Sequence, residues 1–180
     1  MAARVVAVSR RRGHHFSKTP ALSIRLVAGL GVEGDGHFGA KVQHRSRALK
    51  FPDMPNLRQV HLLQAEFLDE LSARFGPVAA GDLGENALVR DLDLLALPRG
   101  ARLRLGAAAV VGLTGLRNPC VQIDRFRPGM MAACLDRDAD GALIRKSGVM
   151  AVVIESGDVA AGDTIAVETP PGPFQPLEPV

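Results

Sequence analysis

Short apolar stretches, broken by glycine or proline, recur along most of the chain. In several of them apolar and polar residues alternate, which puts successive side chains on opposite faces and is typical of half-buried strands. In one such stretch Val60 and Leu62 share a face, while Gln59 and His61 share the other. Strands are expected over residues 5–8, 23–27, 58–62, 103–105, 109–113, 142–146, 148–155 and 164–168.

Helical spacing of apolar residues is clear in one place only. Residues 64–75 predict a helix whose core-facing side chains are Phe67, Leu68, Leu71 and Phe75. Gly76 ends this helix, and Pro77 prevents its continuation. A second, short helix is expected over residues 126–134, with Pro128 in its first turn.

The balance of these elements indicates the fold class. Many short strands with only two or three helices predict a mainly β protein, a β-rich α+β fold built as a barrel. We find no internal repeat and no linker, so residues 1–180 are expected to form a single domain. Proline-rich sequence predicts an extended tail over residues 169–180.

Composition narrows the class of protein. Apolar residues make up 47% of the 180 positions, which allows a sizeable core. No uncharged apolar run reaches the roughly 18 residues of a membrane span, and the N-terminus lacks the apolar core of a signal peptide. Two cysteines cannot form a disulfide framework. We therefore expect a soluble, cytoplasmic protein with no membrane partner.

The formal net charge is only +3, but 18 of the 22 basic residues are arginines. The planar fork of arginine suits phosphates and carboxylates, although a GC-rich genome would also enrich this residue. The chain has no Trp or Tyr for base stacking, and no basic stripe is interleaved with aromatic residues. Nucleic acid is therefore not an expected partner, and a small-molecule substrate is.

Two polar segments are expected to be loops. The first reads SRRRGHHFSKTP over residues 9–20, and it is either an anion-gathering arm or a solvated loop. The second, residues 41–55, contains His44, Arg45 and Arg47, and irregular loops of such length tend to be functional or disordered.

A glycine-rich segment follows the strand at 23–27. Gly29, Gly31 and Gly34 match the dinucleotide-binding pattern, but more glycines follow where that pattern requires a helix, so we reject it. Glu33, Asp35 and His37 alternate and would point the same way in an extended chain. They are candidates for a metal site or a hydrogen-bonded pocket floor; the alternative is that they satisfy backbone donors in turns.

A possible calcium loop begins at Asp136. Asp136, Asp138 and Asp140 start such a pattern, but its twelfth position is Ser147 instead of the required glutamate. We therefore expect a hairpin turn at this place.

The stretch over residues 110–123 carries the strongest candidate for chemistry. An apolar run ends in glycines and is followed by Arg117, Asn118, Pro119 and Cys120. A thiol beside a fixed positive charge favours the thiolate, the form that attacks electrophiles or binds metals. The alternative is a small, inert core residue. Cys134, on the apolar side of the short helix, fits the inert role.

Three polar corners lie at strand ends next to glycines, where the loops of a barrel gather and can meet in one pocket. They are Glu33/Asp35/His37, Glu85/Asn86 and Arg117/Asn118/Cys120.

The chain resembles a known family in motifs that occur in a fixed order. These are EGDGH, RQVHL, GDLGENALVRDLDLLALPRGARLRLG, TGLRNPC and GVMAVVIESGDVAAGD. The combination resembles the MOSC domain, named for the C-terminal domain of molybdenum cofactor sulfurase, over residues 5–167. The resemblance implies a closed, twisted β-barrel with a few helices, in a stand-alone protein of bacterial type.

The resemblance also implies roles for residues. Members with established activity ligate molybdenum of the molybdopterin cofactor through the cysteine of an R-x-P-C element, which is Cys120 here. Arg117 would hold the cofactor phosphate or keep the thiolate charged. The other candidate pocket residues are Asn118, Asn86, Arg58, His61, Glu33, Asp35 and His37.

Three functions follow as alternatives. Related members reduce N-hydroxylated compounds with electrons from partner proteins, which implies an oxidoreductase with an electron-donor protein. Others are described as sulfur carriers, with Cys120 as a persulfide that a sulfur-donor protein would load. A third possibility is a thiol hydrolase with His61 or His37 as base. Pyridoxal phosphate is not expected, because none of the four lysines lies in a recognisable Schiff-base motif.

Overall fold

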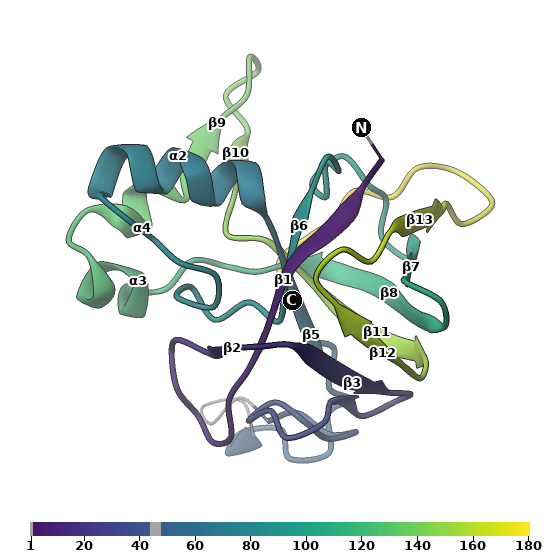
Figure 1. Ribbon diagram of the computed structural model, residues 1–180. Helices are drawn as coiled ribbons and strands as arrows, with labels where there is room; N and C mark the ends of the chain where they lie inside the picture. Colours follow the sequence, from purple (N-terminus) through teal and green to yellow (C-terminus); the bar gives the residue numbers. More distant parts are fainter. Residues whose placement is uncertain (1, 44–47) are drawn as a thin grey trace.

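The computed structural model describes residues 2–43 and 48–180 and arranges the strands in three sheets (Figure 1). Part of the polar segment predicted at 41–55, with His44, Arg45 and Arg47, lies outside the described residues. Neighbours in the largest sheet run antiparallel except for one parallel pair, β5 with β6. Its order is β13 (Ile165–Glu168), β7 (Arg102–Leu105), β8 (Ala109–Leu116), β11 (Val149–Glu155), β5 (Val60–Gln64), β6 (Ala87–Arg90), β1 (Arg4–Arg10) and β2 (Thr19–Ala21).

The expectation of a closed barrel is wrong, because this sheet is open. Its end strands are β13 and β2, which do not pair with each other. An isolated bridge between Arg4 and Thr164 brings β1 close to the start of β13, but it is not continued as a ladder. The broader expectation of a β-rich α+β fold with few helices is confirmed.

Two small sheets complete the strand content. β3 (Ser23–Val27) lies between β12 (Gly157–Ala160) and β4 (Gly31–Val32). β9 (Leu135–Arg137) and β10 (Leu143–Arg145) form a hairpin. In its turn, Asp138 accepts hydrogen bonds from the backbone N–H groups of Asp140 and Ala142 at 3.0 and 2.8 Å, so the expected hairpin turn is confirmed.

The helices gather on one side of the molecule, next to the β9–β10 hairpin (Figure 1). α2 (Ala65–Phe75) agrees with the helix expected from the apolar spacing. The single helix expected over residues 126–134 is wrong, since the chain instead forms α3 (Val121–Phe126) and α4 (Met130–Ala133). Gly129 adopts a left-handed conformation with φ of 82°, which interrupts the helical path after Pro128.

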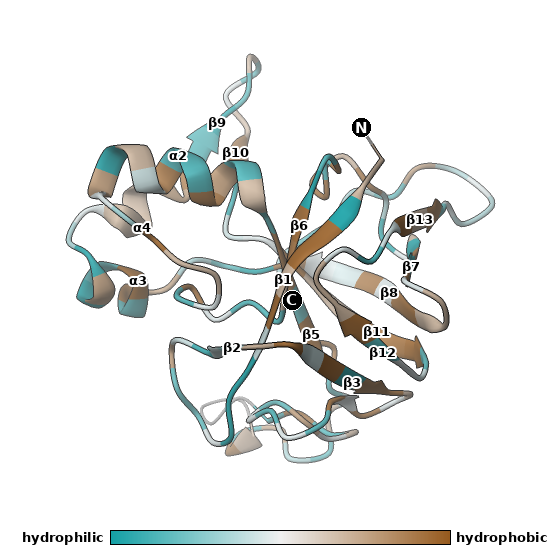
Figure 2. Ribbon diagram, viewed as in Figure 1, coloured by the Kyte–Doolittle hydropathy of each residue, from teal (hydrophilic) through white to brown (hydrophobic). Residues whose placement is uncertain are grey.

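Strand alternation sends apolar side chains to two separate layers. Val5 and Leu62 point into a core enclosed by the sheets, whereas Leu63 packs in a second layer beneath α2 and α4. The central strands are correspondingly hydrophobic in Figure 2. Burying one such side chain contributes about 1.5–3 kcal/mol relative to leaving it exposed. No helix among the described residues is long and apolar enough to cross a bilayer.

The proline-rich C-terminal segment packs against β8. Leu177 is buried, and Glu178 accepts a hydrogen bond from the backbone N–H of Leu116 at 2.8 Å. The backbone N–H of Val180 donates to the carbonyl of Leu116 at 3.3 Å. This contact requires Gly115, because a Cβ there would lie 2.3 Å from the Glu178 carbonyl oxygen. The segment therefore supports the end of the strand that leads into Arg117.

Replacing Gly115 by alanine should detach the C-terminal segment and cost about 1–3 kcal/mol of stability, the range expected for overpacking. Limited proteolysis should then cut near residues 170–176 much faster. Gly112→Ala on the same strand is the matched control, since the nearest atoms to its Cβ belong to the side chains of Ile154, at 2.9 Å, and Val152, at 4.0 Å. Equal protease resistance of the two variants would contradict this role of Gly115.

Candidate functional site

A pocket of about 480 Å³ opens where the end of β8 meets the loop between β1 and β2. Most of its lining residues are basic or polar, and one carries a thiol. The lining residues are His14, His15, Phe16, Lys18, His37, Arg58, His61, Gly84, Asn86, Arg117, Asn118, Pro119, Cys120, Gln122 and Met150.

Cys120 lies immediately before α3, in the turn that follows β8. Its side chain is partly accessible, and its thiol donates a weak hydrogen bond to Gln122 Oε1 at 3.7 Å. By contrast, Cys134 is fully buried, and burial raises the pKa of its thiol to about 11. The expected division between a reactive and an inert cysteine therefore agrees with their exposure.

The backbone of Arg117 is fixed by the start of β11. Its N–H donates to the carbonyl of Gly148 at 2.9 Å, and the hydroxyl of Ser147 donates to its carbonyl at 2.7 Å. Its guanidinium donates to the carbonyl of Leu83 at 2.6 Å and lies 5.9 Å from the ring centroid of Phe16. Burial lowers the pKa of Arg117, but an arginine stays charged in proteins. The thiol therefore shares the pocket with a fixed cation.

His61 is buried on β5, on the face opposite Leu62, as the alternation predicts. Its Nε2 donates to the carbonyl of Ser147 at 2.9 Å. Burial and the charge of Arg117 lower its pKa well below the usual range, so the ring is neutral at pH 7. Among the described contacts, Cys120 makes no hydrogen bond to His61 or His37, which argues against a thiol hydrolase with a histidine base.

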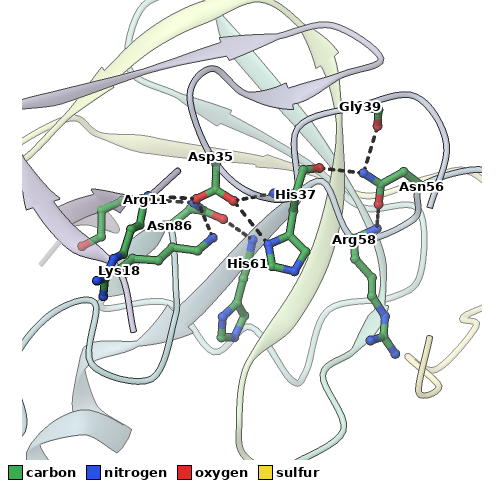
Figure 3. Close-up of polar contacts among 10 residues, drawn as sticks. Arg11, Lys18, Asp35, His37, Gly39, Asn56, Arg58, His61 and Asn86 are labelled. Carbon is green, nitrogen blue, oxygen red and sulfur yellow. Dashed lines mark hydrogen bonds and ion pairs between the residues drawn. The ribbon is translucent and has the colours of Figure 1, made fainter. Parts of the chain in front are cut away.

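Lys18, one of the lining residues, forms a buried ion pair with Asp35 (Figure 3). The ammonium of Lys18 is 2.9 Å from Asp35 Oδ2, and neither side chain is more than 5% exposed. The backbone N–H of His37 donates to Asp35 Oδ1 at 2.9 Å. Burial acts to raise the pKa of Asp35, but the hydrogen bond from His37 and the charge of Lys18 outweigh it, so this pKa lies well below its usual range.

Asn86 links this ion pair to the strands. Its Nδ2 donates to Asp35 Oδ2 and to the carbonyl of Ser9, both at 3.1 Å. Its Oδ1 accepts the backbone N–H of His61 at 3.1 Å. One side chain thereby joins β1, β5 and the turn that follows β4.

Glu85 is a second buried carboxyl near this network. Burial raises its pKa, against the effects of a backbone hydrogen bond from Gly81 and the charges of Arg117 and Lys18. A carboxyl whose pKa is raised binds a proton more readily. Two buried carboxyls therefore lie near the pocket, one ionised in the pair with Lys18 and one with a raised pKa.

The structure brings seven of the nine predicted site residues to the pocket wall. They are His37, Arg58, His61, Asn86, Arg117, Asn118 and Cys120. The other two lie elsewhere, since the carboxylate of Asp35 is buried beneath the pocket and Glu33 lines a different cavity. The chain is not extended here, because the N–H of Asp35 donates to the carbonyl of Val32 in a turn. The premise that Glu33, Asp35 and His37 point the same way is therefore wrong.

Sequence reasoning missed several lining residues. Lys18, His14, His15 and Phe16 come from the polar loop, where only a general affinity for anions was considered. The clustering of two histidines, a lysine and a phenylalanine in one short loop was the sequence feature that could have indicated a pocket wall. Gln122 and Met150 gave no signal, since each sits in an ordinary helical or strand pattern.

The lining determines which ligands fit. Among the described residues, no three His, Cys, Asp or Glu side chains are arranged to hold a bare metal ion. Arg58 and Arg117 instead bring guanidinium groups to the pocket that holds the single accessible thiol, whereas the ammonium of Lys18 is paired with Asp35, and burial lowers its pKa. Such a site suits an anionic group, or a soft metal that arrives with an anionic organic carrier.

Comparisons with known proteins identify a family and similar folds. A family profile described as the MOSC domain matches residues 12–166. The solved structure of the YuaD protein from Bacillus subtilis superposes with a TM-score of 0.75 at 24% identity, over 95% of this chain and 98% of that one. No curated protein matches.

Two further similar structures are both of YiiM. YiiM from Geobacillus stearothermophilus has a TM-score of 0.63 at 17% identity, over 92% of this chain and 75% of that one. YiiM from Escherichia coli has a TM-score of 0.62 at 18% identity, over 96% of this chain and 73% of that one. These likenesses show a shared fold.

Replacing Asp35 by asparagine should destabilise the protein by about 3–5 kcal/mol, because it leaves the buried ammonium of Lys18 without its counter-ion. The folded-state pKa of Asp35 lies below the unfolded value of about 3.9, so the carboxylate stabilises the fold fully above about pH 5. This contribution is lost as the pH falls below that value. Asp35→Asn should therefore show a shallower loss of stability on acidification, measured by urea unfolding at several pH values.

Asp158→Asn is the control for this prediction. Asp158 is 68% exposed and pairs with Arg25 at 3.2 Å, so its loss should change stability very little. A similar effect of the two substitutions would contradict the importance of the buried pair.

Proposed function

This chain belongs to the MOSC domain family, and we propose that its pocket binds the molybdenum cofactor with Cys120 as the protein ligand of the metal. The MOSC domain is associated with functions related to the molybdenum cofactor. One observation carries the proposal: a partly accessible thiol shares an open pocket with Lys18, Arg58 and Arg117. When bound, the cofactor supplies two-electron redox chemistry at a metal.

The residues present fit this group. A thiolate is a soft ligand, and molybdenum accepts such ligands. The cofactor also carries a phosphate, and the guanidinium groups of Arg58 and Arg117 suit phosphate oxygens. The pocket volume of about 480 Å³ lies within the range of small-molecule sites.

The residues around Cys120 have separate roles in this proposal. Arg117 places a permanent positive charge in the pocket that contains Cys120, and its backbone is fixed by Ser147 and Gly148. Asn118 and Gln122 offer polar groups beside the thiol for a bound substrate. His61, which is neutral, donates a hydrogen bond to the carbonyl of Ser147 and so helps to hold the residue that contacts the backbone of Arg117.

The reaction we propose is the reduction of an N-hydroxylated compound. The N–O bond breaks with uptake of two electrons and two protons, and gives the amine-type product and water. The chain holds no electron source of its own among the described residues, so an electron-donor protein is part of the proposal. The open face of the pocket admits solvent, which can supply the protons.

A sulfur carrier is the second candidate. Its support is the partial exposure of Cys120 beside Arg117, because a persulfide needs a reachable thiolate. In that case Cys120 accepts a sulfane sulfur from a donor protein and hands it on, without turnover of its own.

Cys120→Ser should abolish retention of molybdenum when the protein is produced in a host that makes the cofactor. The matched control is Cys134→Ala, since Cys134 is buried away from the pocket lining. Metal analysis of the two purified variants and the wild type is the measurement. Wild-type protein without molybdenum, or a Cys120→Ser variant that keeps it, would contradict the cofactor proposal.

Exposure to a sulfur-donor system distinguishes the second candidate. The carrier function predicts that intact mass spectrometry finds one added sulfur atom, which the Cys120→Ser variant does not acquire. A wild-type protein whose Cys120 remains unmodified under these conditions rules the carrier out.

A further inference from the structure

A second cavity, of about 560 Å³, lies where the two ends of the loop between β1 and β2 meet the turn after β4. Three consecutive arginines dominate its lining. The lining residues are Arg10, Arg11, Arg12, Thr19, Glu33 and Gly34. None of these six residues lines the pocket that contains Cys120.

The three guanidinium groups are not neutralised by acids. Among the ion pairs of the described residues, Arg10, Arg11 and Arg12 take part in none, whereas Arg4 and Arg90 pair with aspartates. Arg10 donates to Glu33, but to its backbone carbonyl, at 3.0 Å. The three arginines and the one glutamate of the lining together carry a net charge of two positive units.

The backbone that carries these arginines is held in place. The N–H of Gly36 donates to the carbonyl of Arg11 at 2.9 Å, and the N–H of Arg11 donates to Asp35 Oδ2 at 3.4 Å. The two backbone segments pack closely at Gly36, because a Cβ there would lie 2.0 Å from the carbonyl oxygen of Gly13. The arginines therefore extend from a segment whose backbone is fixed by these contacts.

We infer that this cavity is a second anion site, which takes the phosphate group of a small molecule. Guanidinium forks bind phosphate oxygens in pairs, and the hydroxyl of Thr19 adds a neutral donor. A phosphate monoester carries about −1.5 to −2 charges at pH 7, which matches the net charge of the lining. The carboxylate of Glu33 opposes binding and thereby limits the affinity for anions. The inference does not rest on the proposed function, since it involves no residue of the Cys120 pocket.

Titration with inorganic phosphate at low ionic strength, followed by NMR of the arginine side chains, tests the site. Saturable shifts are expected at Arg11 and Arg12. Arg12→Gln should weaken this binding about two- to fivefold, as expected for one exposed ionic contact, and Glu33→Gln should tighten it by a similar factor. Both residues are exposed, so circular dichroism should find the fold unchanged.

Two controls make the result specific. Arg102→Gln changes the net charge equally, but at an exposed position of strand β7 outside this lining, and should leave the affinity unchanged. Arg58→Gln alters the Cys120 pocket and should leave the shifts at Arg11 and Arg12 unchanged. The inference is overturned if Arg58→Gln alone abolishes binding, if Glu33→Gln weakens it, or if the triplet responds to an acidic peptide and not to phosphate.

Discussion

The buried ion pair between Lys18 and Asp35 is the interaction on which both cavities depend. Two charges removed from water cost several kcal/mol each unless hydrogen bonds and mutual attraction offset that cost. The carboxylate of Asp35 accepts hydrogen bonds from Lys18, His37, Asn86 and the backbone N–H of Arg11, which offset the cost of its burial. These donors come from different parts of the chain, so a single carboxylate fixes how the polar loop lies against the sheet.

Polar groups that stabilise the fold are thereby distinct from those that a ligand can reach. Asp35 and Asn86 are almost fully enclosed, and their hydrogen bonds are used within the fold. Cys120 and Arg58 reach the pocket from other segments and face a volume that a ligand can enter. The proposed chemistry therefore rests on a thiol and cations beside a buried polar network, and the same network contacts the arginine triplet through the backbone of Arg11.

Local sequence predicted the elements better than their assembly. Helix α2 was predictable because Phe67, Leu68 and Leu71 alternate with polar residues at helical spacing. The interruption at Gly129 was not, because a glycine after a proline is compatible with a helix start as well as with a break. The closed barrel was expected from strand number and family resemblance, but closure depends on pairing between distant end strands, which no local pattern encodes.

The candidate site shows the same limit. The thiol beside Arg117 was evident in the sequence, and the pocket gathered most of the polar corners that were singled out. Lys18 was missed because its role depends on an ion pair with Asp35, which is distant in sequence. Glu33 was assigned to the wrong pocket because the chain turns at Asp35 and is not extended there. Contacts between segments that are distant in sequence decided both cases.

Alkylation of the two thiols, with and without bound cofactor, tests the central claim most directly. Cys134 is buried and serves as the internal reference. If Cys120 is the metal ligand, mass spectrometry of cofactor-loaded protein should find it protected, and removal of the cofactor should restore rapid modification. Equal modification of Cys120 in loaded and stripped protein would contradict the account.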